Sequence, residues 1–263
     1  MAQTKLPWEI ENIVRGKNHT VNTTGMSGAQ VWMYEDMVLK IQPCMPWVRR
    51  ELTMLQWLSG RLPVPRLIAH QELKGKSYCL MTRIRGKMAC DSQFLDNPEL
   101  LTARLAEAMQ MLWSVDTSAC PVCRSQELEL EEARRQVEEG RVDITAVEPE
   151  TFGPGGFPDP ETLLVWLEKN RPSYDPVLSH GDFCLPNIFL TQTGISGFID
   201  LGDAGVGDRW RDISLCWRSL KNNTNGRHGK IRPEVDPARL FDALGIRPDR
   251  EKMRWYLLLD ELF

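Results

Sequence analysis

Residues 179–205, SHGDFCLPNIFLTQTGISGFIDLGDAG, contain side chains whose types and spacing could transfer a phosphoryl group. Asp182 is followed after four residues by Asn187, and Asp200 comes in a second apolar run. The apolar runs on either side of TQTG predict two short strands joined by a turn, which would place Asn187 near Asp200. An amide and a carboxylate suit a hard divalent cation such as Mg²⁺. Asp182, in the loop before the first strand, could orient a hydroxyl group and accept its proton.

The spacing H-x-D-x-x-x-x-N, followed by a second aspartate, matches the catalytic loop and the metal-binding aspartate of kinases. The loop reads H-G-D instead of H-R-D, and the second motif reads I-D-L-G instead of D-F-G. This combination resembles the aminoglycoside phosphotransferase family. The motif becomes informative once its structural context is known.

Length and composition limit the possible classes of protein. The 263 residues are enough for one large domain or two lobes that share a cleft. Hydrophobic residues make up 42% and charged residues 26%, as in ordinary globular proteins. The net charge of -4 argues against a nucleic-acid-binding surface.

The beginning of the chain and its cysteines indicate where the protein works. It starts with neither a basic segment nor an apolar run typical of a signal peptide, and no run of about 18 apolar residues predicts a membrane span. The seven cysteines are scattered and odd in number, which favours reduced thiols in the cytoplasm. Cys120 and Cys123 form a C-x-x-C pair, but a zinc site needs four ligands, so a turn with buried thiols is the simpler interpretation.

Lys40 lies in an apolar strand, where a buried ammonium group needs an anionic partner. Residues 31–34 and 37–41 predict two strands, and residues 49–59 predict a helix that carries Glu51 in its first turn. Glu51 is the natural partner of Lys40, although it could instead be solvated near the helix N-terminus.

Two backbone segments could contact a nucleotide. The turn at residues 25–28 could place N–H groups and the Ser27 hydroxyl over phosphate oxygens, or it could be an ordinary hairpin turn. Residues 66–72 and 77–83 predict a hairpin that leads into the segment 81–86. In a kinase layout this segment is the hinge, with Met81 and Arg83 at the adenine; otherwise it is an edge strand that runs into a loop.

Beyond residue 95 the pattern becomes helical. Helices are expected from residue 97, over residues 125–139 and from Asp159, whose side chain can cap a helix that starts with a proline. A strand-rich first part and a helix-rich remainder predict an α+β protein with two lobes, residues 1–95 and 96–263.

Acidic residues gather in two places that could attract a polycation. The first is the loop 143–158, with Glu148 and Glu150. The second is the chain end, where Asp260, Glu261 and a terminal carboxylate follow a helix whose C-terminus already favours cations. Both sets could also be merely solvated.

The segments GMSGAQVW, LKI, LPVP, SHGD, PNIF, SGFIDLGD and LLLDELF together look like an aminoglycoside 3'-phosphotransferase. The resemblance implies a bilobal protein-kinase-like fold, with an N-terminal antiparallel sheet lobe that has one main helix and a larger, mostly helical C-terminal lobe. It implies ATP or GTP as the phosphate donor, Mg²⁺, and phosphorylation of the 3'-hydroxyl of kanamycin- and neomycin-type antibiotics, which gives resistance.

The resemblance also implies roles for individual residues. Asp182 is the catalytic aspartate, and Asn187 and Asp200 bind the metal. The phosphates are contacted by Ser27, Lys40 and Glu51. The residues that fall where the family contacts its substrate are Glu148, Arg218, Asp260, Glu261 and Phe263.

Some alternatives remain open at this point. The chain departs from some relatives at four positions, so the range of antibiotics and the choice of nucleotide stay undecided: Val38, Thr145, Leu185 and Asp203, the last of which replaces an arginine. The second interpretation is a related kinase for choline, fructosamine or a macrolide. The acidic loop and the DELF ending favour a polyamine substrate over these. An inactive kinase fold that only binds is the third. We expect a monomer or weak dimer, with no nucleic acid or membrane as partner.

Overall fold

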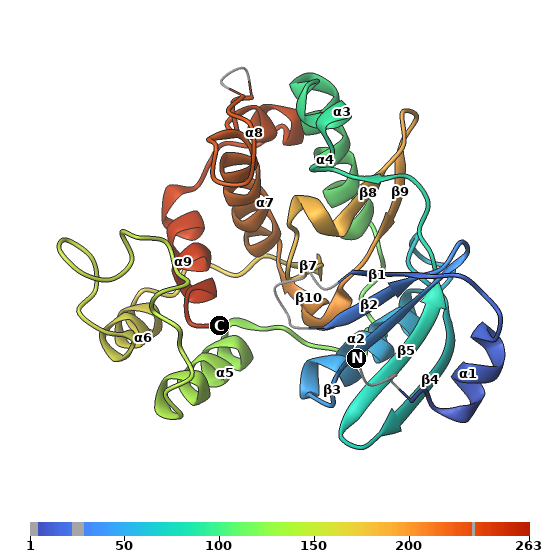
Figure 1. Cartoon of the computed structure of the whole chain (residues 1–263). Helices are drawn as coiled ribbons and strands as arrows, with labels where there is room; N and C mark the ends of the chain where they lie inside the picture. Colours follow the sequence, from blue (N-terminus) through green and yellow to red (C-terminus); the bar gives the residue numbers. More distant parts are fainter. Residues whose placement is uncertain (1–4, 23–28, 233–234) are drawn as a thin grey trace.

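The first part of the chain folds as a five-stranded antiparallel sheet with the strand order β1-β2-β3-β5-β4 (Figure 1). The computed structural model describes residues 5–22, 29–232 and 235–263. The two predicted hairpins are confirmed, with turns at Glu35-Asp36 and at Lys74-Gly75. The strands are β1 (Thr20–Asn22), β2 (Gln30–Met33), β3 (Met37–Pro43), β4 (Leu67–Leu73) and β5 (Lys76–Thr82).

Two helices accompany this sheet, where the sequence predicted one main helix. Helix α2 (Pro46–Leu58) begins at Pro46 instead of residue 49, because a proline suits the first turn, whose N–H groups have no partner in the helix. The short α1 (Trp8–Val14) was not predicted, since its apolar pattern is weak. It buries Ile10 and Val14 in the core under the sheet.

The second part of the chain is mostly helical. Ser125 and Asp159 cap α5 and α6 by accepting hydrogen bonds from backbone N–H groups, as expected for these residue types. The helix that follows Asp236-Pro237 begins at Arg239, and the last helix ends at Asp260. The helices are α3 (Ser92–Leu95), α4 (Pro98–Trp113), α5 (Gln126–Glu138), α6 (Pro160–Lys169), α7 (Arg209–Thr224), α8 (Arg239–Leu244) and α9 (Arg250–Asp260).

Two small antiparallel sheets lie among these helices and carry the motif. β8 (Ile188–Leu190) and β9 (Ile195–Phe198) form the hairpin predicted around TQTG. β6 (Lys87–Met88) joins them by pairing with β8. β7 (Pro176–Ser179) pairs with β10 (Gly205–Asp208).

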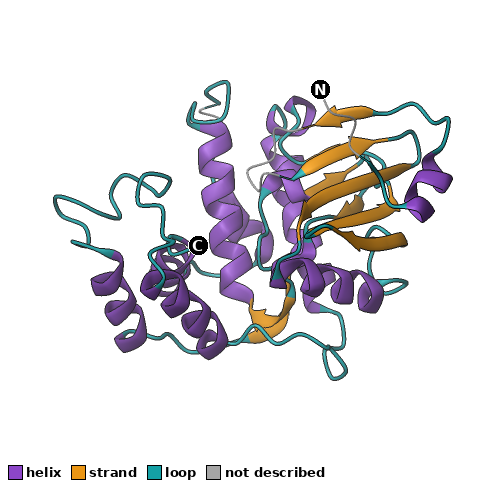
Figure 2. Ribbon diagram, turned by 60° about the horizontal axis from the view of Figure 1, so that its bottom comes forward, coloured by secondary structure: helices purple, strands orange, loops and turns teal. Residues whose placement is uncertain are grey.

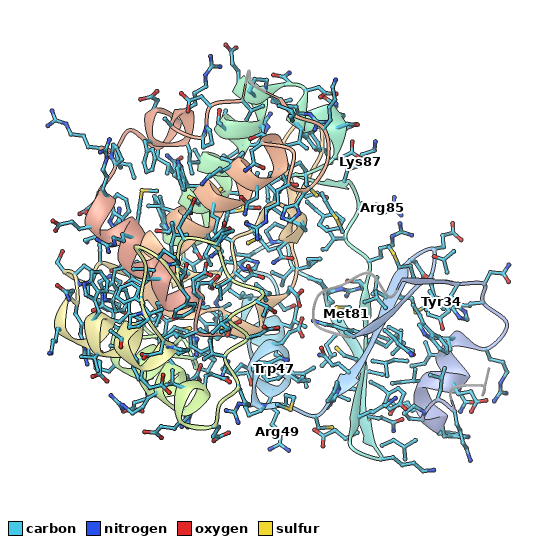
Figure 3. All side chains as sticks on the ribbon, turned by 60° about the vertical axis from the view of Figure 1, so that its left-hand side comes forward. Tyr34, Trp47, Arg49, Met81, Arg85 and Lys87 are labelled. Carbon is cyan, nitrogen blue, oxygen red and sulfur yellow. The ribbon has the colours of Figure 1, made fainter. Side chains whose placement is uncertain are left out.

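The sheet and the helices form two groups with a single connecting segment. Figure 2 shows the large sheet on one side and most helices on the other. Figure 3 shows Met81 in the sheet and Arg85 and Lys87 on the segment that leads to the helical group. Since residues 87–88 already pair with β8, the boundary predicted at residue 95 stays a prediction, and this pairing favours an earlier division.

The helical core also receives side chains from the sheet lobe. Met54, Leu55 and Leu58 of α2 belong to the apolar cluster formed by the C-terminal helices. Helix α2 therefore contacts both lobes, which makes its polar side chains candidates for contacts between them. In the part of the chain that the structure describes, no helix has the length and apolar character needed to cross a membrane.

Candidate active site

The loop His180-Gly181-Asp182 is held by a buried aspartate at the start of α7. Asp212, which is inaccessible to solvent, accepts hydrogen bonds from Ser179 Oγ at 3.0 Å, from His180 N at 2.8 Å and from Gly181 N at 2.9 Å. Three donors on one carboxylate fix the backbone just before Asp182. This arrangement gives the loop a rigid support on the helical core.

Gly181 explains why the loop reads H-G-D. Its φ is +79°, a region that residues with a side chain rarely adopt. A Cβ atom at this position would lie 2.1 Å from the carbonyl oxygen of Asp203. The close approach of these two backbone segments therefore requires a glycine.

Asp182 is oriented by Asn187, its predicted neighbour in the motif. Asn187 Nδ2 donates to Asp182 Oδ2 at 2.8 Å and to the carbonyl oxygen of Asp182 at 3.0 Å. Asn187 itself is buried at the end of a short 3₁₀ turn, Leu185–Asn187. Burial raises the pKa of the Asp182 carboxyl, which favours its acting as a proton acceptor at a pH closer to neutral.

Asp200 lies beside this pair, just beyond β9. Ile199 N donates to the carbonyl oxygen of Asn187 at 3.0 Å, so the backbone that precedes Asp200 is attached to Asn187. The second strand of the predicted hairpin ends at Phe198, before Asp200. Asp200 adopts a left-handed φ of 63°, which aspartate tolerates better than most residues. Its side chain is 46% exposed, so the carboxylate remains accessible to solvent.

Lys40 connects the sheet lobe to this site. Lys40 Nζ lies 3.1 Å from Glu51 Oε2 and also contacts Asp200 Oδ1. Burial alone would lower the pKa of Lys40, but Glu51 and Asp200 raise it above its ordinary value, so the side chain stays charged. The predicted ion pair is confirmed, although Glu51 is buried and lies in the second turn of α2, not the first.

Asn187 and Asp200 suit a metal that is shared with a bound phosphate. Among the described residues, no group of three His, Cys, Asp or Glu side chains converges as a metal site. Mg²⁺ is commonly held by one or two carboxylates together with substrate phosphates and water. The two oxygen-bearing side chains therefore fit such an ion, and a nucleotide would complete its ligands.

The other residues expected at the nucleotide are placed less clearly. Ser27 lies outside the described residues. Met81 is buried in β5, opposite Val38. Arg83 N donates to the carbonyl oxygen of Asp36 at 3.0 Å, so this N–H group is already used within the lobe.

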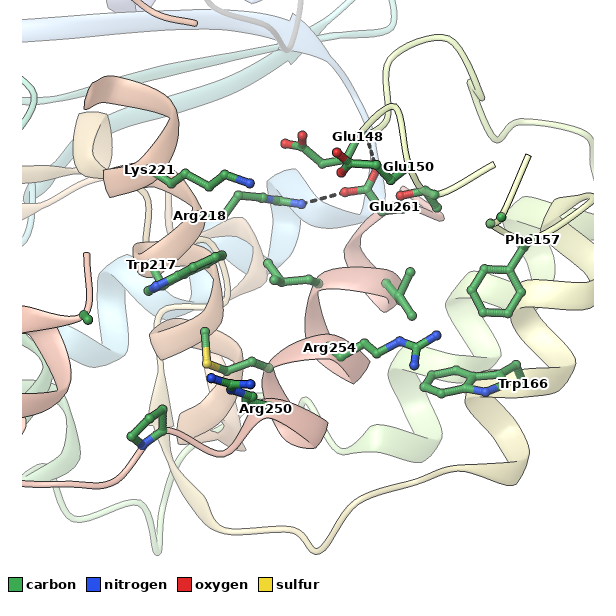
Figure 4. Close-up of a pocket in the computed structure, with 18 of the residues that line it drawn as sticks. Glu148, Glu150, Phe157, Trp166, Trp217, Arg218, Lys221, Arg250, Arg254 and Glu261 are labelled. Atoms are coloured by element: carbon green, nitrogen blue, oxygen red, sulfur yellow. Dashed lines mark hydrogen bonds and ion pairs between the residues drawn. The ribbon is translucent and has the colours of Figure 1, made fainter. Parts of the chain in front are cut away.

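Glu148 and Glu261 lie beside Arg218 in Figure 4, and Asp260 contacts Arg218 as well. Arg218 Nη1 donates to Glu261 Oε1 at 2.8 Å, and its other nitrogen contacts Asp260. Glu148 N donates to the second oxygen of Glu261 at 2.7 Å, which attaches the loop 143–158 to the end of α9. The structure thus brings four of the five predicted residues into one network.

A cavity of about 880 Å³ lies beside this network, between α7, α9 and the loop. Its walls include Glu148, Glu150, Arg218 and Glu261 together with aromatic side chains such as Trp217. The fifth predicted residue, Phe263, is 51% exposed, while Leu262 is fully buried and anchors the chain end.

A buried ionic cluster close to the motif was not predicted from the sequence. Arg124, Glu129 and Arg211 are 4%, 2% and 5% exposed. Asp203, which replaces an arginine found in some relatives, takes part in this cluster. Its Oδ1 lies 3.1 Å from Arg50 Nη2 and 3.6 Å from Arg124 Nη2. The sequence offered no local signal for it, because Arg211-Asp212 stands at the start of a helix that carries several other charged and polar residues.

Comparison with known proteins identifies the family of the chain. Residues 20–256 match the phosphotransferase enzyme family. The chain belongs to this family. An aminoglycoside 3'-phosphotransferase from Enterococcus faecalis is 34% identical to the chain, and the match covers 100% of both proteins.

Two further relatives of this phosphotransferase are informative. A streptomycin 3''-kinase from Streptomyces griseus is 31% identical, with 91% of this chain and 90% of the relative covered. The crystal structure of a type VIII aminoglycoside-3'-phosphotransferase superposes with a TM-score of 0.80 at 27% identity, covering 97% of both chains. The resemblance inferred from the motifs and the α+β, kinase-like fold are therefore confirmed.

Proposed function

We propose that this phosphotransferase moves the γ-phosphate of ATP or GTP to the 3'-hydroxyl of aminoglycosides such as kanamycin and neomycin, which gives antibiotic resistance. One observation carries the proposal: Lys40, Asp182, Asn187 and Asp200 form a single kinase-like site in a chain that matches a 3'-phosphotransferase over its full length. We also propose that it works in the cytoplasm, where nucleotide and Mg²⁺ are available, as a monomer or weak dimer.

Lys40 is proposed to bind the nucleotide phosphates. It pairs with Glu51 and contacts Asp200, so two acids fix the position of its charge. Mg²⁺ held by Asn187 and Asp200 would neutralise charge on the phosphates. Ser27 would add a hydroxyl contact to them.

Adenine is proposed to bind at the segment after β5. We predicted Met81 and Arg83 there, but Arg83 N–H already donates to Asp36. The N–H of Ile84, one residue further, donates to no described backbone carbonyl. We therefore place the adenine donor at Ile84.

Asp182 is proposed as the general base. Its side chain is held by Asn187 and its backbone by the loop that Asp212 fixes. A hydroxyl placed between Asp182 and the γ-phosphate would lose its proton to the carboxylate as the new P–O bond forms. The bond from the γ-phosphorus to the bridging β–γ oxygen breaks in the same step, and the nucleoside diphosphate leaves with the electron pair. Correct placement of the acceptor and stabilisation of charge contribute most of the catalysis in such a reaction.

The acceptor is proposed to bind through its ammonium groups. Glu148, Asp260 and Glu261 provide negative charge near the loop, and charge-assisted hydrogen bonds to ammonium groups are stronger than neutral ones. Arg218 now neutralises part of this charge. An aminoglycoside would compete with Arg218 for the same oxygens.

A panel of acceptors tests this proposal. Phosphate transfer from ATP and from GTP is measured with kanamycin, neomycin, streptomycin, choline and no acceptor. We expect the highest kcat/KM with kanamycin or neomycin and background rates with choline. Streptomycin as the preferred acceptor would favour the activity named for the Streptomyces griseus relative, and no transfer to any acceptor would favour an inactive binding module.

A further inference from the structure

Arg211 lies where three parts of the proposed site meet. Its Nε donates to the carbonyl oxygen of Gly181 at 2.7 Å. Its Nη2 lies 3.6 Å from Asp260 Oδ1, and its Nη1 lies 3.2 Å from Glu129 Oε1 as an ion pair without an aligned hydrogen bond. One buried guanidinium group therefore contacts the catalytic loop, a proposed acceptor ligand and helix α5.

The contact with Gly181 completes the support of the catalytic loop. Asp212 accepts the N–H of Gly181, and Arg211, the preceding residue on α7, donates to its carbonyl oxygen. Both polar groups of the residue before Asp182 are thus fixed by consecutive residues. The orientation of the Gly181–Asp182 peptide depends on both of them, because Gly181 has no side chain to restrict it.

Glu129 holds Arg211 in place from the opposite side. Glu129 Oε1 lies between Arg211 Nη1 and Arg124 Nη2, at 3.2 and 3.4 Å. Arg124 is itself fixed, since its N–H donates to Val206 O at 2.8 Å and its side chain crosses Gly205, where a Cβ atom would lie 2.8 Å from Arg124 Cγ. These contacts leave the guanidinium of Arg211 little freedom.

The cluster continues to the sheet lobe. Arg124 Nη1 lies 2.9 Å from Glu132, and Arg50 Nη1 lies 3.0 Å from the same carboxylate. Arg50 Nε donates to Gly202 O at 3.0 Å, next to the metal motif. Arg50 precedes Glu51 on α2, so the same ionic cluster reaches the helix that orients Lys40.

We propose that Arg211 is a positioning residue for phosphoryl transfer, which sets the catalytic loop and the acceptor-binding Asp260 at a fixed spacing. This inference rests on the proposed function. The structural reason is the shape of the group: a guanidinium presents five donors in a fixed plane and can serve three acceptors at once, while the ammonium of lysine is a compact point charge. Burying such a charge is costly unless each partner is in place, so the whole cluster acts as one unit.

The test compares Arg211→Gln, Arg211→Lys and the native enzyme, with Arg209→Gln as a matched control. Arg209 lies two residues earlier on α7 and pairs with Asp175 at the surface, outside the cluster. For each protein, kcat, the KM for kanamycin, the KM for the nucleotide and the melting temperature are measured. If another acceptor of the panel is the better substrate, the comparison uses that acceptor.

We expect Arg211→Gln to lower kcat by about 10- to 100-fold, as the loss of a hydrogen bond from a charged group would predict. The KM for kanamycin should rise several-fold, because Asp260 loses a partner that fixes it, and the KM for the nucleotide should stay within about twofold. Arg211→Lys should keep the charge beside Asp260 and so restore the KM for kanamycin more than kcat. Arg209→Gln should leave all three constants unchanged.

A purely structural role would give a different result. In that case Arg211→Gln would lower the melting temperature, while the folded enzyme kept native kcat and KM values, and the proposal would be overturned. If Arg211→Gln does not fold, Arg211→Lys decides: an unchanged kcat overturns the proposal and a reduced kcat supports it. If the native enzyme is active and the Arg211 variants keep its kinetic constants, only this inference is overturned. If the native enzyme itself is inactive, the proposed function is overturned.

Discussion

Asn187 Nδ2 donates a 2.8 Å hydrogen bond to Asp182 Oδ2, which joins the proposed metal ligand to the proposed base. The same amide nitrogen reaches the carbonyl oxygen of Asp182. Since the nitrogen points at Asp182, the amide oxygen of Asn187 is left for a cation. One side chain thus serves both halves of the site.

The role proposed for Asp182 predicts that its substitution lowers turnover without weakening nucleotide binding. Asp182→Asn keeps the shape of the side chain but removes the proton acceptor, so kcat should fall by about 100- to 10,000-fold. The nucleotide Kd, measured by calorimetry, should change little. A decrease in kcat of less than about tenfold would mean that another group takes the proton.

The metal assignment predicts that Asp200 is indispensable. Asp200→Ala removes the carboxylate that faces Lys40, so activity should vanish, and EDTA should abolish the activity of the native enzyme until Mg²⁺ is added back. The measurement is the formation of ADP or GDP that depends on added kanamycin. Turnover that persists in EDTA would contradict the metal assignment.

The tight packing of Gly181 predicts a strong effect of a single methyl group. Gly181→Ala forces a Cβ atom toward Asp203 O at a φ of +79°, and this should lower the free energy of unfolding by at least about 3 kcal/mol. Gly140→Ala is the control, since its φ is +62° and nothing lies within 4 Å of the added atom. Gly140→Ala should cost only about 1–2 kcal/mol in urea unfolding. Equal losses for both variants would show that the approach of Gly181 to Asp203 is relaxed in solution.

The acidic end of α9 predicts a selective effect on the acceptor. Glu261→Gln weakens the contacts with Arg218 and Glu148 and removes negative charge, so the KM for kanamycin should rise by about tenfold while the KM for the nucleotide stays constant. Glu251→Gln, at an exposed position of the same helix, should change neither constant. Similar kanamycin KM values for both variants would mean that Glu261 is only a structural residue.

Much of the site could be predicted because it depends on local patterns. The β8–β9 hairpin follows from apolar runs around TQTG, and once it forms, Asn187 and Asp200 must be neighbours. The Lys40–Glu51 ion pair could be predicted because a lysine in an apolar strand needs an anion and one helix acid was near.

Other features depend on the packing of distant segments and left no local signal. Arg124 and Arg211 belong to segments with ordinary helix-start sequences, and their burial results from the approach of α5 to α7 and β10. Arg83 looked available for adenine, because its bond to Asp36 forms only when β3 and β5 pair. The helix α1 is too short and too weakly patterned to be predicted without the sheet that covers it.

The most direct test of the central claim is the site of phosphorylation. Kanamycin and tobramycin, which has no 3'-hydroxyl, are incubated with the enzyme, Mg²⁺ and ATP or GTP, and the products are analysed by mass spectrometry and phosphorus NMR. We predict that kanamycin gains one phosphate on its 3'-oxygen and that tobramycin is not modified. Phosphorylation of tobramycin at a rate similar to that of kanamycin, or a phosphate at another position of kanamycin, would contradict the proposed 3'-phosphotransferase activity.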